Sequence, residues 1–141
     1  MKGDAMFDYT GWFRAVLKQD RAELRAFFEK DAVIRWFCTN ERFTLEEYLV
    51  ANCDYPGAWE GEVERVQETG EELILVTRVY PPDRSASFHC VSFLRCREGK
   101  IAALDEYWAD DGAAPDWRRA LKLGKPIREK GKLDSYHLLS S

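Results

Sequence analysis

The sequence predicts a single α+β domain, in which helices from the N-terminal part pack against one face of a curved β-sheet. Three helical segments come first and four strand-like segments follow, an order that is typical of this class. The links between the strand-like segments are short, which favours antiparallel hairpins. With 141 residues, the chain is long enough to bury one hydrophobic core and too short for a second domain.

Two helices at the start of the chain are predicted from apolar residues that recur at the helical period. These residues are Phe7, Trp12, Phe13, Val16 and Leu17 in the first helix and Leu24, Phe27 and Phe28 in the second. Asp20 followed by Glu23 is typical of a capping box, so the chain is expected to turn at residues 18–20 and to form a helical hairpin. The second helix is expected to end by Asp31.

A short strand and a third helix are predicted next. Residues 32–38 are β-branched and aromatic, which favours a strand. Thr44 and Glu47 repeat the capping-box pattern and predict a third helix that continues through about Asn52. The Pro56-Gly57 pair ends this part of the chain, because both residue types favour turns.

Beyond Trp59 the apolar residues alternate, as they do in strands. The four predicted strands span residues 59–67, 73–80, 87–96 and 101–109, and turn residues separate them. The strand at 73–80 is apolar on both faces, whereas a sheet with one solvated face would alternate cleanly. The second face is therefore expected to be covered, either by another copy of the protein or by the C-terminal tail.

The expected domain comprises residues 1–112, and residues 113–141 are expected to form a basic extension that packs loosely on it. Residues 115–132 of this extension carry few apolar side chains. Within the domain, the acidic residues Glu60, Glu62 and Glu64 alternate along the first long strand and predict one solvated strand face.

The composition argues against several classes of partner and cofactor. With 21 Lys and Arg against 25 Asp and Glu, the net charge of −4 does not predict a nucleic-acid partner. No segment approaches the roughly 20 apolar residues of a membrane span, and the first residues do not resemble a signal peptide, so no membrane partner and a cytoplasmic location are expected. Four cysteines without C-x-x-C spacing and two histidines supply no ligand set for zinc. No metal or cofactor is predicted, and the cysteines are expected to be free, buried thiols.

Aromatic residues make up 13% of the chain, with five Trp, six Tyr and eight Phe. In a domain of this size, so many rings predict either a thick core or the walls of a cavity. Several of the tryptophans lie on strand faces expected to point inward, which favours a pocket for a flat apolar ligand.

Two segments carry a resemblance to a known family. The segment "DRAELRAFFEKDAVIRW" turns from helix to strand and "EGKIAALDEYWADDG" closes the sheet, so that residues 5–112 resemble the SnoaL-like and ketosteroid-isomerase-like fold of the nuclear-transport-factor-like superfamily. The resemblance implies a cone-shaped, mixed but mainly antiparallel sheet wrapped around three N-terminal helices. Members of this fold include isomerases, dehydratases, cyclases, epoxide hydrolases and binding proteins, so the fold leaves the function open.

The resemblance also implies a candidate catalytic site. It places the acid of the cyclases and epoxide hydrolases, near the end of the last strand, at Glu106. The alternation along that strand predicts that Glu106 shares one face with Leu104 and Trp108. Arg78 occupies the place of the epoxide hydrolases' arginine, whereas Tyr80 occupies the place of an aspartate, which makes epoxide hydrolysis doubtful. The places of the isomerases' catalytic groups fall at Trp12, Trp36 and approximately Ser92, and none of these can perform that chemistry.

Glu106, Arg78 and Tyr80 are therefore the predicted catalytic residues, expected to converge on one polar spot. There Glu106 would act as base or acid in a proton transfer next to a carbonyl, and Arg78 or Tyr80 would stabilise the developing negative charge. The alternative is that Arg78 and Glu106 form a cross-strand ion pair with a purely structural role. The predicted ligand pocket consists of Trp12, Trp36, Trp59, Cys90, Ser92 and Trp108.

The opposite, convex face of the sheet is predicted to form a homodimer interface. The residues expected on this face are His89, Val91, Phe93 and Tyr107. A one-residue bulge would instead turn His89 toward the pocket. Together these features predict a protein that binds a small apolar or aromatic metabolite, with or without a cofactor-free isomerase-, lyase- or cyclase-type reaction. The alternative function is a ligand-binding or dimeric assembly module without catalysis.

Overall fold

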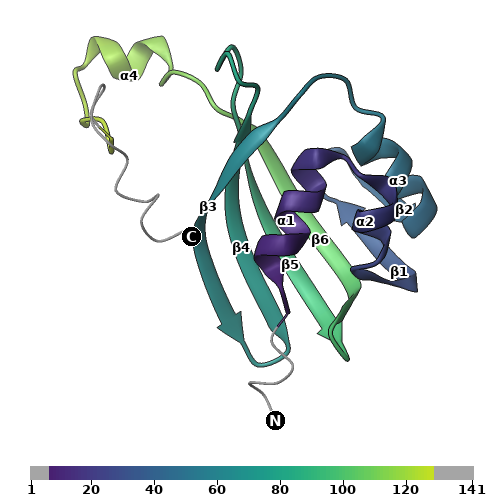
Figure 1. Ribbon diagram of the computed structural model, residues 1–141. Coiled ribbons are helices and arrows are strands. Elements are labelled where there is room, and N and C mark those ends of the chain that lie inside the picture. The colour runs from purple at the N-terminus through teal and green to yellow at the C-terminus, as the bar shows by residue number, and fades with distance from the viewer. Residues whose placement is uncertain (1–6, 129–141) are drawn as a thin grey trace.

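The computed structural model describes residues 7–128 and confirms the predicted α+β class. Within these residues two helices, two strands and a third helix come first, and a run of four strands and a short helix follow (Figure 1). In chain order they are α1 (Tyr9–Lys18), α2 (Arg21–Arg25), β1 (Phe28–Trp36), β2 (Glu41–Thr44), α3 (Leu45–Cys53), β3 (Glu60–Thr69), β4 (Glu72–Tyr80), β5 (Phe88–Arg97), β6 (Lys100–Asp110) and α4 (Asp116–Ala120).

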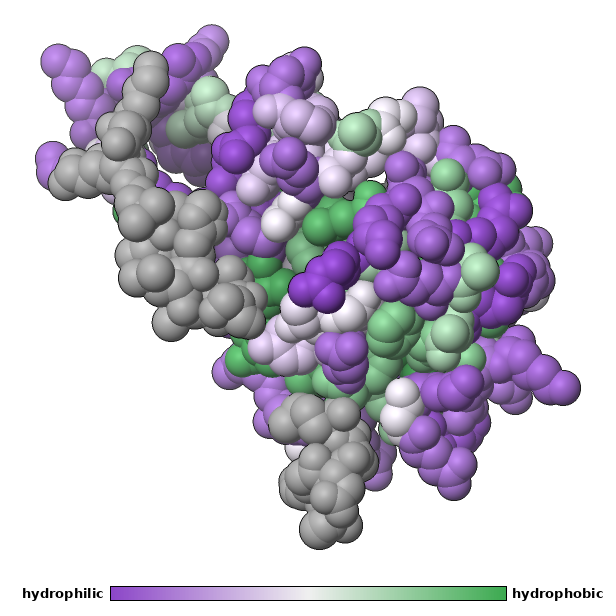
Figure 2. Space-filling view, viewed as in Figure 1, coloured by the Kyte–Doolittle hydropathy of each residue, from purple (hydrophilic) through white to green (hydrophobic). Residues whose placement is uncertain are grey.

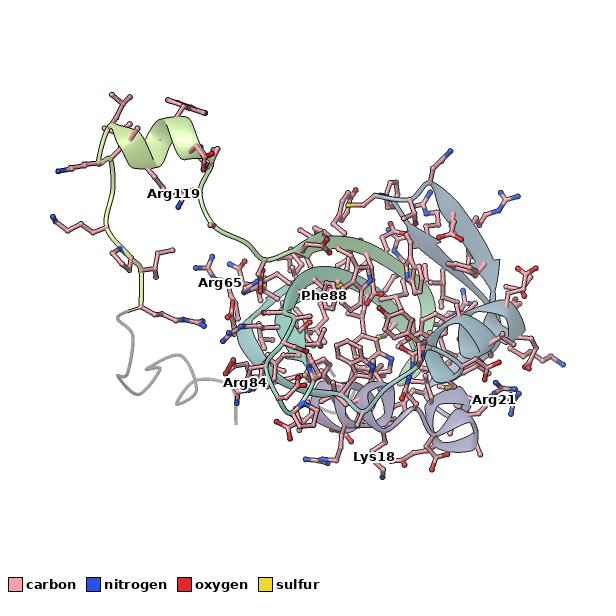
Figure 3. All side chains as sticks on the ribbon, turned by 90° about the horizontal axis from the view of Figure 1, so that it is seen from above. Lys18, Arg21, Arg65, Arg84, Phe88 and Arg119 are labelled. Atoms are coloured by element: carbon pink, nitrogen blue, oxygen red, sulfur yellow. The ribbon has the colours of Figure 1, made fainter. Side chains whose placement is uncertain are left out.

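The strands form one mixed sheet in the order β2-β1-β6-β5-β4-β3. Strands β1 and β6 are parallel, and the other neighbouring pairs are antiparallel. The parallel pairing sets Trp36 opposite Glu106, although 70 residues separate them in the chain. Seen from above, the sheet curves around side chains that fill its inner side, with α1–α3 closing the open side (Figure 3).

The capping residues predicted from the sequence begin the helices. The Asp20 side chain accepts a hydrogen bond from the Glu23 N–H at 3.0 Å. Thr44 and Glu47 form a full capping box at the start of α3, with bonds of 2.9 and 3.2 Å between each side chain and the other residue's N–H. Helix α1 ends at Lys18 and is capped by Gln19, whose left-handed backbone (φ 57°) allows the tight turn of the hairpin.

One element prediction was wrong, and two short elements were missed. The second helix ends at Arg25, and Phe28 already belongs to β1, because the Phe27 carbonyl accepts a backbone bond from Ile101 of β6. The spacing of Phe27 and Phe28 fits a helix as well as a strand, and only this distant pairing decides between them. Strand β2 and the short helix α4 were not predicted.

The hydrophobic core lies between α1–α3 and the concave face of the sheet. The buried residues of the strands point to this side, among them Ile34, Leu75, Leu94 and Leu104. Hydrophobic residues also gather near the centre of the face on which α1 crosses the sheet (Figure 2). At this crossing α1 lies so close to β3 that a Cβ atom on Gly61 would come within 2.8 Å of the Phe13 ring.

The chain beyond β6 extends away from the sheet (Figure 1). Residues 113–127 are exposed, and α4 contributes no buried residue. The remainder of the predicted basic extension, residues 129–141, lies outside the described residues. In the described part of the chain no helix is long and apolar enough to cross a membrane.

All four cysteines lie in the described residues and are free thiols. Cys90 is buried, Cys53 and Cys96 are half-buried, and Cys38 is exposed, so the expectation of buried thiols is met fully by Cys90 and was wrong for Cys38. Burial raises the pKa of the Cys96 thiol to about 11.

Candidate functional site

A cavity of about 350 Å³ opens between the helices and the concave face of the sheet. Its wall comes from the ends of α1 and α3, from the segment after α3 and from the ends of β1, β4, β5 and β6. The residues that line it are Val16, Leu17, Gln19, Trp36, Cys38, Thr39, Ala51, Asn52, Tyr55, Trp59, Val79, Phe88, Trp108 and Asp110. Figure 3 shows Phe88 on the inner side of the curved sheet. The cavity volume falls within the range of small-molecule sites.

Three tryptophans of the wall are fixed by hydrogen bonds from their indole N–H groups. Trp36 and Trp108 both donate to Oε1 of Glu106, at 3.1 and 3.3 Å. Trp59 donates to the carbonyl of Pro56 at 3.0 Å. Because each indole N–H already has an acceptor, these rings offer the cavity their carbon surfaces.

Glu106 forms the centre of a buried polar cluster at the base of this wall. The residue is 4% exposed, and its Oε2 accepts a hydrogen bond of 2.6 Å from the Ser92 hydroxyl. The Cys90 thiol lies 3.4 Å from the same hydroxyl. Burial raises the pKa of Glu106, and the hydrogen bonds from Ser92, Trp108 and Trp36 oppose this effect in part.

The strand register explains why these groups meet. Leu104, Glu106 and Trp108 share the inner face of β6, as the alternation predicts. Ser92 lies opposite Glu106 on β5, and Trp36 lies opposite Glu106 on β1. The prediction that these residues share the concave face is therefore supported by the geometry.

The predicted convergence of Arg78 and Tyr80 on Glu106 does not occur. On β4 the residues that point to the core are Leu73, Leu75, Thr77 and Val79. Arg78 lies on the opposite, convex face, opposite His89 on β5, and its guanidinium bonds to Glu62 at 3.2 Å. The Tyr80 ring packs against Arg78 and Arg84, with guanidinium-to-ring distances of 5.2 and 4.1 Å. Because both faces of this strand are apolar, alternation alone could not select the inner one.

The convex face carries a charged cluster around Arg78, whose acidic partners are Glu62 and Asp111. His89 lies there, without an inward bulge, and its ring nitrogens contact Asp111 at 2.5 Å and Glu64 at 3.1 Å. Arg128 bonds to the same Glu64. Burial lowers the pKa of His89, but the hydrogen bonds to Asp111 and Glu64 outweigh it, so that the pKa is raised.

The predicted solvated face of Glu60, Glu62 and Glu64 was wrong for two of its members. Glu62 is 8% exposed, and the side chain of Glu64 is 14% exposed. Arginine and histidine side chains of neighbouring segments cover both, so that Glu62 is buried and Glu64 is partly buried. The sequence pattern showed the alternation but not the cations that cover it.

The predicted pocket residues divide into two groups. Trp36, Trp59 and Trp108 line the cavity. Trp12 does not, because it is a buried core residue of α1, and Cys90 and Ser92 lie beside Glu106 below the cavity wall. Sequence reasoning missed the wall residues from α1, from α3 and from the segment after it. Phe88 could have been found, because it alternates in register with Cys90 and Ser92.

Comparison with known proteins agrees with this architecture. The sequence profile of the SnoaL-like domain matches residues 9–104. A search of curated proteins found no match. Among solved structures, a candidate ketosteroid isomerase from Kribbella flavida is 21% identical, with a TM-score of 0.70 over 86% of this chain and 88% of that one. An NTF-2 like protein from Burkholderia xenovorans is also 21% identical, with a TM-score of 0.69 over 89% and 94% of the two chains.

A third structure, from Catenulispora acidiphila, has a ketosteroid isomerase-like fold and was determined in complex with trimethylamine. It is 13% identical to this chain, with a TM-score of 0.60 over 72% of this chain and 86% of that one. An epoxide hydrolase and candidate polyketide cyclases also match. At these identities the likeness establishes the fold, and the activities named for these proteins differ from one another. The match to the profile covers more than half of the chain, which therefore belongs to the SnoaL-like domain family.

Proposed function

We propose that this protein binds a small molecule with a compact apolar body in the cavity between the helices and the sheet. The observation that carries the proposal is the cavity itself, about 350 Å³ in volume, with three fixed indole rings in its wall. Phe88 and Tyr55 extend the aromatic surface, with ring centroids 5.8 and 5.5 Å from Trp59. Apolar walls with few polar groups are typical of small-molecule sites.

The geometry favours binding over proton transfer. A general acid or base must come within hydrogen-bond distance of the ligand. Glu106 is not among the described residues that line the cavity, and three donors already occupy its carboxyl oxygens. Arg78 and Tyr80, expected to stabilise negative charge beside it, lie on the other face of the sheet. In this arrangement Glu106 holds Trp36 and Trp108 in place.

Replacing Trp59 by leucine tests the proposed site. The neutral dye N-phenyl-1-naphthylamine fluoresces in apolar sites, and we expect it to bind one equivalent of the wild-type protein. In Trp59→Leu its affinity should fall by about tenfold, because an aromatic contact of roughly 1 kcal/mol and part of the buried ring area are lost. Fluorescence titration measures both constants.

The matched control is Trp117→Leu. Trp117 lies on α4 and is 62% exposed, so the same substitution there should leave dye affinity unchanged. Dye affinity that is equal in Trp59→Leu and wild type would place the bound dye elsewhere and contradict the proposed site.

The convex face carries a second proposal, that two copies of the chain associate through its aromatic residues. The rings of Phe37 and Tyr107 stack in parallel, with centroids 4.8 Å apart, although both residues are more than 40% exposed. Phe93 packs edge-on against Tyr107 at 6.1 Å. Val91 shares this face, whereas His89 is engaged by Glu64 and Asp111. Exposed aromatic clusters of this kind are typical of protein interfaces.

Light scattering coupled to size-exclusion chromatography tests the association. We expect a dimer mass for the wild type at micromolar concentration and a monomer mass for Tyr107→Glu, because a carboxylate at the centre of an apolar interface is costly to desolvate. A wild-type chain that elutes as a monomer would exclude this interface.

A further inference from the structure

The polar groups around the cavity have a consistent character. Among residues 7–128, no Lys, Arg or His lines it, whereas one carboxylate does, that of the exposed residue Asp110 at the cavity mouth. Asp110 makes no ion pair with another described residue. The Glu106 carboxyl adds a second acidic group directly behind the indoles of Trp36 and Trp108. The described wall therefore combines one carboxylate with aromatic rings, has the Glu106 carboxyl behind two of these rings, and has no cationic side chain.

The side-chain N–H groups of the two amide residues at the cavity, Gln19 and Asn52, are already hydrogen-bonded within the protein. Nε2 of Gln19 donates to the carbonyls of Asn52 and Tyr55, at 3.0 and 2.7 Å. Nδ2 of Asn52 donates to the carbonyl of Val16 at 3.2 Å and, more weakly, to the sulfur of Cys53 at 3.8 Å. An amide nitrogen carries two hydrogens, so these contacts account for all of them. The amide oxygens accept no hydrogen bond from another described residue.

The remaining donors of the wall are few. The Thr39 hydroxyl donates to Glu41 at 2.7 Å, and the three indole N–H groups have the acceptors described above. Within the described lining, the Tyr55 hydroxyl is the one strong side-chain donor without an acceptor, and Tyr55 is 53% exposed. A ligand in the cavity thus meets aromatic carbon surfaces, acceptor oxygens and a carboxylate.

We propose that the ligand of this cavity is a small organic cation, an apolar body that carries a substituted ammonium group, held by the indole rings and by Asp110. This inference rests on the proposed binding function and adds the charge of the ligand to it. The faces of tryptophan rings attract ammonium groups, since the ring carries negative charge above its plane. An indole whose N–H donates to a carboxylate becomes richer in electrons, so Glu106 strengthens this attraction at Trp36 and Trp108.

The polar groups of the cavity wall also disfavour anionic ligands. An anion or a developing oxyanion needs hydrogen-bond donors or cations directed at it. The side chains of the described wall leave such a ligand one exposed tyrosine hydroxyl, and Asp110 repels it. A neutral ligand would fill the cavity without using its carboxylate.

A series of three ligands of similar shape tests the charge preference. Phenyltrimethylammonium, tert-butylbenzene and benzenesulfonate carry a positive, a neutral and a negative group on the same ring. Isothermal titration at low ionic strength should give an affinity for the cation about tenfold above that for tert-butylbenzene. Benzenesulfonate should bind more weakly than both.

Two variants assign the preference to the cavity. Asp110→Asn should lower the ratio of cation affinity to neutral affinity by about threefold, because it removes a carboxylate near the bound charge. Asp116→Asn makes the same change on the exposed helix α4 and should leave the ratio as in the wild type.

The outcomes separate the two proposals. Equal or tighter binding of tert-butylbenzene, weakened by Trp59→Leu, would overturn the cation preference and leave the binding function standing. Failure of both the cation and the neutral ligand to bind would overturn both. A preference for the cation that persists unchanged in Asp110→Asn would remove Asp110 from the site.

Discussion

Glu106→Leu is expected to lower the free energy of unfolding by about 3 kcal/mol. The substitution removes the acceptor of two indole N–H groups and of the Ser92 hydroxyl, and a buried donor left without an acceptor costs about 1–3 kcal/mol. The release of a buried carboxylate offsets part of this cost. Urea denaturation should show a lower midpoint with an unchanged slope.

Glu106→Gln is the matched control, because the amide keeps an acceptor oxygen for Trp36 and Trp108 and donates to Ser92. Burial raises the pKa of Glu106, so the folded state binds its proton more tightly than the unfolded state. The wild type should therefore lose stability as the pH rises from the unfolded-state pKa, near 4.5, through the folded-state pKa, and the glutamine variant should lack this loss.

Thermal unfolding from pH 4 to pH 8 measures this difference. The stability of the glutamine variant relative to the wild type should increase as the pH rises. If both variants were as stable as the wild type at every pH, the carboxyl would have no role in fixing the two indoles.

Gly61→Val is expected to cost about 3 kcal/mol, although valine favours strands. A Cβ atom at this position would lie 2.7 Å from the Arg78 carbonyl oxygen, 2.8 Å from the Phe13 ring and 3.2 Å from Leu17. The carbonyl belongs to the neighbouring strand β4, so it cannot move without disturbing the pairing of β3 and β4. Leu17 lines the cavity, and its displacement should also weaken ligand binding.

Gly112→Val provides the comparison for this variant. A Cβ atom on Gly112 would meet no atom within 4 Å, so the stability should change by less than about 0.5 kcal/mol. The urea midpoints of the two variants measure the difference. Equal midpoints would show that α1 does not pack on β3 as closely as the structure has it.

The site was predictable where a local pattern matched the tertiary arrangement. Alternation along the last strand placed Glu106 and Trp108 on one face, and β6 shows the same division. The capping residues Asp20 and Thr44 fixed the starts of α2 and α3, because a cap is a contact between residues three apart. Alternation failed for Arg78, since β4 is apolar on both faces and its inner side is decided by what packs against it.

The sequence by itself determined the fold class, the order of most elements and the supply of aromatic rings, because these follow from periodicity and composition. Only the tertiary structure decided which rings form the cavity. Trp36 and Trp108 meet at Glu106 because β1 pairs in parallel with β6, 70 residues further along the chain. The side-chain N–H groups of Gln19 and Asn52 are hydrogen-bonded because the ends of α1 and α3 are in contact. Such contacts join residues far apart in the chain, and no local pattern records which donors they use. The character of the cavity, aromatic and acidic, is therefore a property of the folded chain.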